Sequence, residues 1–220
     1  MLAFIYFIDK ISAWIGKAFA WCVVVMTLGI SYEVFVRYLP RIFRSLGIDD
    51  APVLRDLIPL MAPTPWAFDM SYIMYGALFM MAGAYTLSRD AHVRADMFYR
   101  MWPPRVQARL ELFLYVIFFY PGVLALIFYG WDYAADSFRY REVSINSPAG
   151  IPIYQLKFII PAAGLALAVQ GLAQMARCIV CIRTGQWPPL LPDVEETESI
   201  LVHTQEDIGD KPANTGATRP

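Results

Sequence analysis

The chain has 220 residues, of which 58% are apolar and 17% are charged, and its mean hydropathy is +0.45. Soluble domains contain about 45–50% apolar residues, so this composition excludes an ordinary soluble domain and indicates an integral membrane protein. The formal net charge of −1 excludes the strongly basic surface that nucleic-acid-binding proteins carry.

The N-terminal segment, before residue 18, repeats large apolar residues at helical spacing. The recurring positions are Leu2, Ile5, Ile8, Ile11 and Ile15. We expect an amphipathic helix that lies in the membrane interface and contacts lipid. The triplet AFA at 18–20 resembles a signal-peptide cleavage site. Asp9 and Lys10 interrupt the apolar stretch and no basic region precedes it, so we expect no cleavage.

Four further segments are long and apolar enough to cross a bilayer, which takes about 20 residues of helix. They cover residues 18–36, 66–87, 110–131 and 158–179. The sequence therefore predicts an all-α membrane protein with four transmembrane helices, in a domain over residues 1–184. Residues 185–220 are acidic and rich in Pro and Thr, so we expect a disordered cytoplasmic tail.

The distribution of Lys and Arg predicts the orientation of these spans. With four spans, the two termini and the middle loop share one side of the membrane, which carries 11 Lys and Arg residues against 7 on the other side. The middle loop, LSRDAHVRADMFYR at 87–100, holds the densest cluster. Because positive residues are retained in the cytoplasm, we expect both termini there.

Charged side chains within the spans are few. Glu33 precedes Arg37 by one helical turn near the outer surface, a geometry that suits a salt bridge or a contact to a partner. Asp69 lies in the first turns of the second span, where the helix dipole favours an acid. Thr64 before Pro65 offers an N-cap for that helix. We interpret these residues first as structural.

The middle loop combines the arginines expected at a cytoplasmic surface with a particular order of His, Arg and Asp. On a helix, His92 and Asp96 would share one face, with Arg94 between them in the sequence. Retention by anionic headgroups explains the arginines, but it does not require this order.

The sequence argues against a catalytic or redox centre. Its two histidines, His92 and His203, lie outside the spans, which excludes a bis-histidine haem within the membrane. Cys178 and Cys181 form a C-x-x-C near the end of an apolar helix, which we interpret as small apolar filler rather than a redox or zinc pair. We therefore expect no catalytic residue, no metal site and no cofactor.

Small residues mark the second and fourth spans, and Gln170 is the only strongly polar residue deep in the fourth. Small residues let helices approach closely in lipid, so these faces either pack the four helices or bind another subunit. A self-contained transporter would show broken helices with polar residues near the bilayer midplane, and one amide does not make such a path.

The segment WAFDMSYIMYGALFMMAGAYTLSRDAHVRADMFY at 66–99 resembles the signature region of the small membrane subunit of tripartite ATP-independent periplasmic (TRAP) transporters. Trp66 and Asp69 match the start of the family's second span, with Asp where many relatives have Glu. His92, Arg94 and Asp96 match its H-V-R-x-D motif. FVRY at 35–38, SFRYREVS at 137–144 and residues 152–177 are also similar, so the resemblance covers about 12–183.

The long external loop and the W-A-F-D form are most similar to the branch labelled for mannitol or chloroaromatic compounds. The resemblance implies a non-catalytic scaffold in the bacterial inner membrane, with both termini cytoplasmic. It implies a large, elevator-type membrane subunit as partner, which carries the substrate and sodium sites, and a periplasmic substrate-binding protein. The transport expected is sodium-coupled import of organic acids, either 2-oxo or hydroxy acids or dicarboxylates.

Structural or partner contacts are the roles expected for seven residues: Glu33, Arg37, Trp66, Asp69, His92, Arg94 and Asp96. The alternative function is a self-contained four-helix membrane carrier or channel. A membrane-anchored enzyme is a third interpretation, which the scarcity of histidine disfavours.

Overall fold

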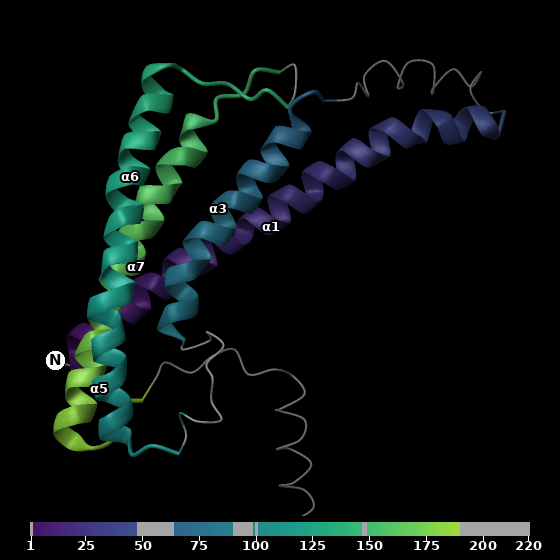
Figure 1. Ribbon diagram of the computed structural model, residues 1–220. Helices are drawn as coiled ribbons and strands as arrows, with labels where there is room; N and C mark the ends of the chain where they lie inside the picture. Colours follow the sequence, from purple (N-terminus) through teal and green to yellow (C-terminus); the bar gives the residue numbers. More distant parts are fainter. Residues whose placement is uncertain (1, 48–63, 90–98, 100, 147–148, 190–220) are drawn as a thin grey trace, which may run out of the picture. The chain divides into compact units, whose positions relative to one another are not determined.

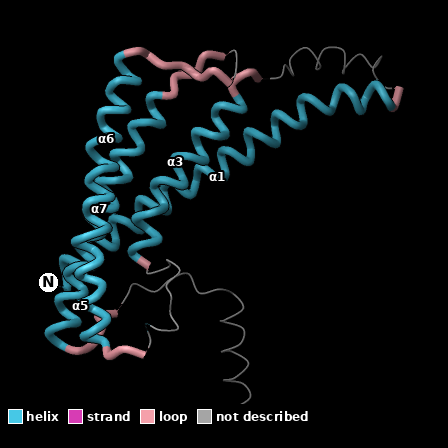
Figure 2. Tube along the Cα trace, viewed as in Figure 1, coloured by secondary structure: helices cyan, strands magenta, loops and turns pink. Residues whose placement is uncertain are grey.

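A computed structural model of the chain describes residues 2–47, 64–89, 99, 101–146 and 149–189. The helices are α1 (Leu2–Ser45), α3 (Ala67–Ser88), α5 (Pro104–Leu114), the π-helical η1 (Tyr115–Phe119), α6 (Tyr120–Arg139) and α7 (Tyr154–Thr184). The connection from α6 to α7 is described apart from residues 147–148 and is drawn as a loop in Figure 2. Since α5, η1 and α6 run on without a break, four helices are long and apolar enough to cross a membrane, which confirms the predicted fold class.

The contacts between helices centre on α7. It packs against α1, α3, α5 and α6, while α1 also packs along α3. Figure 1 shows α6 and α7 running side by side, with α3 lying along α1. The fourth span of the sequence is therefore the element through which the other three are held together.

Small residues of α3 and α7 allow these close approaches. A Cβ atom added at Gly171 would lie 2.6 Å from the ring of Phe119, and one at Gly164 would lie 2.8 Å from the side chain of Ile127. On α3, a Cβ atom at Gly76 would lie 3.0 Å from a leucine side chain of α7. The small-residue faces thus serve packing within this chain, which is one of the two roles that the sequence left open.

The N-terminal segment is helical as expected, but it continues into the first span as one helix of 44 residues. Ile5 and Ile8, which belong to the apolar stripe expected to face lipid, are instead buried against Ala173 of α7. At 1.5 Å per residue the helix is about 66 Å long, roughly twice the thickness of the bilayer hydrocarbon. The whole helix therefore cannot lie along the membrane normal within the hydrocarbon.

The third span contains a local change of helical register close to a proline. Residues 115–119 are π-helical and lie immediately before Pro121. Proline has no backbone N–H, so the i→i+4 bond to residue 117 cannot form, and the N–H of Tyr120 bonds to the carbonyl oxygen of Tyr115 instead. The wider turn absorbs the proline while the helix continues.

The last span begins earlier and ends later than the sequence predicts. α7 starts at Tyr154 rather than near residue 158, and ends where Gly185 takes a left-handed conformation with φ +82°. The N–H of Gly185 donates to the carbonyl oxygen of Cys181 at 2.7 Å, closing the final turn. The tail from residue 190 onward lies outside the described residues.

Candidate functional site: polar contacts between the helices

Glu33 connects α1 to the segment that leads into α3. One carboxylate oxygen accepts from the guanidinium of Arg37, with an N–O distance of 2.6 Å. The other oxygen accepts from the Thr64 hydroxyl at 2.6 Å and the Thr64 backbone N–H at 3.0 Å. Glu33 is buried, whereas the Arg37 side chain is 58% exposed. The acid is thus fully engaged, and the arginine keeps a solvent-facing or partner-facing side.

The expectation that Thr64 caps α3 is wrong. Trp66 occupies the N-cap position, and no side chain there hydrogen-bonds the first turn. The Thr64 hydroxyl instead donates a charge-assisted hydrogen bond to the buried carboxylate of Glu33. The connection from Thr64 to α1 replaces the local cap.

Asp69 connects the start of α3 to the loop between α6 and α7. Its side chain is completely buried and accepts a hydrogen bond of 2.7 Å from the Ser144 hydroxyl. The Ser144 backbone N–H in turn donates to the carbonyl oxygen of Ile151 at 2.7 Å, which closes the loop on itself. The acid predicted from the family resemblance therefore fixes a loop that is distant in sequence.

Glu142 holds the same loop to α7. It forms an ion pair with Lys157 and accepts from the Ser137 hydroxyl. The hydrogen bond from Lys157, followed by that from Ser137, holds the pKa of the Glu142 carboxyl below its usual value. Lys157 also lies over the ring of Tyr133, with its ammonium nitrogen 4.0 Å from the ring centroid. These contacts give the loop a defined conformation at the end of α6.

A second polar cluster lies where the N-terminal part of α1 meets the C-terminal half of α7. Asp9 forms an ion pair with Arg177 and accepts from the Gln170 amide at 2.8 Å. The Ser12 hydroxyl donates to the Gln170 side-chain oxygen at 2.7 Å, and all four side chains are buried. Gln170 is therefore a structural residue here, rather than part of a transport path.

Sequence reasoning missed this cluster, which brings together residues separated by 168 positions. Arg177 had been counted only as a positive residue at the membrane surface. A usable signal was present, because Asp9 shares one side of a helix with Ile5 and Ser12. An acid on a mostly apolar helical side needs a buried partner.

The two cysteines of the C-x-x-C are buried and unoxidised, and they pack against Ala108 of α5. That environment is typical of small apolar filler. Among the described residues, no group of three or more Cys, His, Asp and Glu side chains is placed to hold a metal ion.

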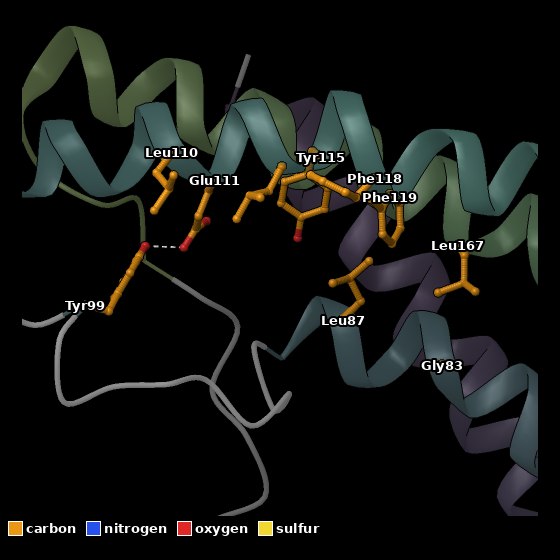
Figure 3. A pocket seen from close by; sticks show the side chains of 10 residues that line it. Gly83, Leu87, Tyr99, Leu110, Glu111, Tyr115, Phe118, Phe119 and Leu167 are labelled. Carbon is orange, nitrogen blue, oxygen red and sulfur yellow. Dashed lines mark hydrogen bonds between the residues drawn. The ribbon is translucent and has the colours of Figure 1, made fainter.

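A groove with a volume of about 850 Å³ lies between α3, the α5–η1 segment and α7. Figure 3 shows Leu87, Phe119 and Leu167 along it, with Tyr99 donating to the carboxylate of Glu111 near one end. Apart from that polar end the lining is aliphatic and aromatic. The groove suits hydrocarbon or apolar side chains rather than a charged substrate.

The structure thus brings Glu33 and Arg37 together and joins Asp69 to a distant loop, while Trp66 is exposed at the start of α3. His92, Arg94 and Asp96 lie outside the described residues. The contacts of Glu33 with Thr64, of Asp69 with Ser144 and of Asp9 with Arg177 each join two helices or fix a connection between them. The arrangement of the described residues is suited to holding helices in place.

A protein-family model described as "Tripartite ATP-independent periplasmic transporters, DctQ component" matches residues 26–181. The match covers most of the chain, including Glu33, Asp69 and the fourth span. Among curated proteins, none matches the chain.

Proposed function

This chain belongs to the DctQ component family of tripartite ATP-independent periplasmic transporters, and from that premise we propose that it is the fixed scaffold subunit of such a transporter. The family implies a tripartite complex with a large membrane subunit and a binding protein. In this proposal, the large subunit binds and moves the substrate and the coupling sodium ions. This chain stabilises it and provides a surface against which it moves.

The observation that supports a fixed scaffold is the way polar side chains are used in the described helices. Between α1 and α7, a hydrogen bond joins Asp9 to Gln170 and an ion pair joins Asp9 to Arg177. Glu33 and Asp69 each bind a connection between helices. Carboxylate, amide and guanidinium groups of the kind that bind a solute or ion in a transporter are here engaged in contacts between helices or with their connections.

The runner-up is a self-contained four-helix carrier or channel. Carriers usually place broken helices and free polar groups near the bilayer midplane. In the described part of this chain, α3 and α7 run unbroken and the third span departs from α-helix only at η1. The residues of η1 are aromatic or aliphatic, so this widened turn supplies no polar side chain of the kind that coordinates an ion.

Partner contacts are proposed for residues on both sides of the membrane. The exposed Arg37 and Trp66 would meet the large subunit or the binding protein on the outer side. His92, Arg94 and Asp96 would meet the large subunit on the cytoplasmic side. This assignment places both termini in the cytoplasm, as the Lys and Arg distribution favours.

The substrate class remains part of the same proposal. The sequence form WAFD and the long external loop resemble the branch labelled for mannitol or chloroaromatic compounds, and that resemblance implies import of 2-oxo or hydroxy acids or dicarboxylates. The binding protein would determine the substrate, because this chain presents a groove that is apolar except at one end.

The test is reconstitution in vesicles with a sodium gradient. Four preparations are compared: this chain alone, a large TRAP membrane subunit alone, both together, and both with a periplasmic binding protein. We expect uptake of a radiolabelled organic acid only in the last preparation. Sodium-driven accumulation by this chain alone would support the carrier and contradict the scaffold.

A further inference from the structure

The N-terminal part of α1 presents an exposed face for which the proposed scaffold role gives no explanation. Residues 2–25 lie outside the range that the family model matches. The inner side of this segment is occupied, since Ile5, Asp9 and Ser12 are buried against α7. The opposite side carries Trp14 and Trp21, which are 72% and 69% exposed and are the most exposed tryptophans of the described residues.

On the exposed side, the side chains change from charged to aromatic to fully apolar around the helix axis. With about 100° of rotation per residue, Lys10, Lys17, Trp14 and Trp21 fall within an arc of about 60°. The two lysines form one edge of this arc and the two tryptophans form the other. Beyond the tryptophans, away from the lysines, the exposed Phe4, Phe7 and Ile11 continue the surface.

Lysine followed by tryptophan and then by phenylalanine matches the polarity profile of a membrane from headgroup to acyl chain. Lysine extends its ammonium group into the headgroups, an indole prefers the boundary, and a phenyl ring prefers hydrocarbon. Lys10 and Trp21 are 11 residues apart, about 16 Å along the axis. Where this part of α1 lies nearly along the membrane surface, that separation leaves the four side chains at one depth.

The charge of this face is positive and uncompensated within the described chain. Asp9, the acid next to Lys10, points inward and is paired with Arg177. Neither Lys10 nor Lys17 takes part in an ion pair among the residues that the structure describes. The complement to two exposed ammonium groups beside a hydrocarbon-facing surface is an anionic lipid headgroup.

We propose that Lys10, Trp14, Lys17 and Trp21 form a binding site for anionic phospholipid. The lysines bind the phosphate and the indoles lie at the boundary of the same lipid molecules, in the leaflet on the N-terminal side. The site fixes the depth and rotation of α1, whose inner face is already bound to α7. It is independent of which large subunit the chain serves.

The test uses the full chain in nanodiscs of phosphatidylcholine that contain a small, equal fraction of acyl-brominated phosphatidylglycerol or acyl-brominated phosphatidylcholine. Bromine quenches nearby indoles. The emission of Trp14 and Trp21 is obtained by subtracting that of the variant Trp14→Phe/Trp21→Phe, because the chain has 6 tryptophans. We expect a several-fold preference for brominated phosphatidylglycerol, with an upper limit of about 30-fold for two lysines, and a decrease at high salt.

Three variants make the result specific. Lys10→Gln/Lys17→Gln should abolish the preference, and Lys10→Arg/Lys17→Arg should retain it. Arg41→Gln/Arg44→Gln, at the opposite end of α1, should leave it unchanged. Equal quenching by the two lipids, or a preference that survives Lys10→Gln/Lys17→Gln, would overturn the proposal. Absence of quenching by either lipid would also overturn it, since protein would then cover this face.

Discussion

At the scale of single residues, the ion pair of Asp9 and Arg177 has the largest expected effect on stability. Arg177 is buried, and its Nε and Nη1 atoms have no hydrogen-bond partner within the described chain. Removal of Asp9 would leave a buried cation without its counter-charge. We expect Asp9→Ala to lower the free energy of unfolding by about 3–5 kcal/mol, as measured by denaturant titration in mixed micelles.

The double variant Asp9→Leu/Arg177→Met serves as the diagnostic partner of that experiment. It removes both charges and leaves the Gln170 amide without its acceptor, so we expect it to recover part of the lost stability. Asp132→Ala is the matched control, because this acid is exposed on α6 and its removal should change stability by less than about 0.5 kcal/mol. A double variant no more stable than Asp9→Ala would show that the charges do not compensate each other.

Glu142 gives the loop between α6 and α7 a dependence on pH. Its pKa in the folded protein is lowered, chiefly by the hydrogen bond from Lys157. Stabilisation from a lowered carboxyl pKa is complete above the unfolded value, near 4.5, and is lost as the pH falls through the folded value. We expect the melting temperature of the wild type to fall more steeply below pH 4.5 than that of Glu142→Gln. Parallel melting profiles for the two proteins would contradict this role.

At the scale of helices, close packing of α7 can be tested with two glycines in different environments. A Cβ atom at Gly171 would meet the ring of Phe119 at 2.6 Å, whereas one at Gly29 of α1 would meet nothing within 4 Å. We expect Gly171→Ala to reduce stability by about 1–3 kcal/mol, because a rigid ring must move. Gly29→Ala should increase stability slightly, since alanine favours the helix. Equal thermal stability of the two variants would argue against close contact at Gly171.

Hydrophobic patterns were sufficient to predict the existence and type of these helices, since the number of spans depends on composition and length. They were not sufficient to show that the N-terminal segment and the first span form one continuous helix. Charged residues such as Lys17 do not end a helix. Neither proline nor glycine interrupts residues 2–15, and the contacts of Asp9 with α7 stabilise this part of the helix.

Among the candidate contacts, those between residues close in sequence could be predicted, and those between residues far apart in sequence could not. Glu33 and Arg37 lie one helical turn apart, so their salt bridge could be predicted from spacing alone. The use of Thr64 could not be predicted, because its partner Glu33 lies 31 positions away on another helix. The position of Asp69 in the first turn of a span is visible in the sequence, but its contact with Ser144 depends on how α3 meets the loop between α6 and α7.

At the scale of the molecule, the polar contacts lie at both ends of the helical assembly. Asp9 joins α1 to α7 at one end. Glu33 and Asp69 join connections at the other end, near the start of α3. A large subunit that moves against this chain requires a surface whose helices stay together. Polar contacts at both ends of the helices oppose their separation. This division of contacts is what a scaffold requires, whereas a carrier must open at each end in turn.

The proposed scaffold role predicts that the charged middle loop contributes to assembly. We expect Arg94→Ala or Asp96→Ala to weaken co-purification of the large subunit at least tenfold, because truncating one member of a buried charge pair at an interface costs about 2–5 kcal/mol. The measurement is the ratio of the two subunits after affinity purification through a tag on this chain. Arg109→Ala is the matched control, since Arg109 is exposed on α5 in the same stretch of positive residues. Loss of uptake with an unchanged subunit ratio would assign these residues to the transport cycle rather than to assembly.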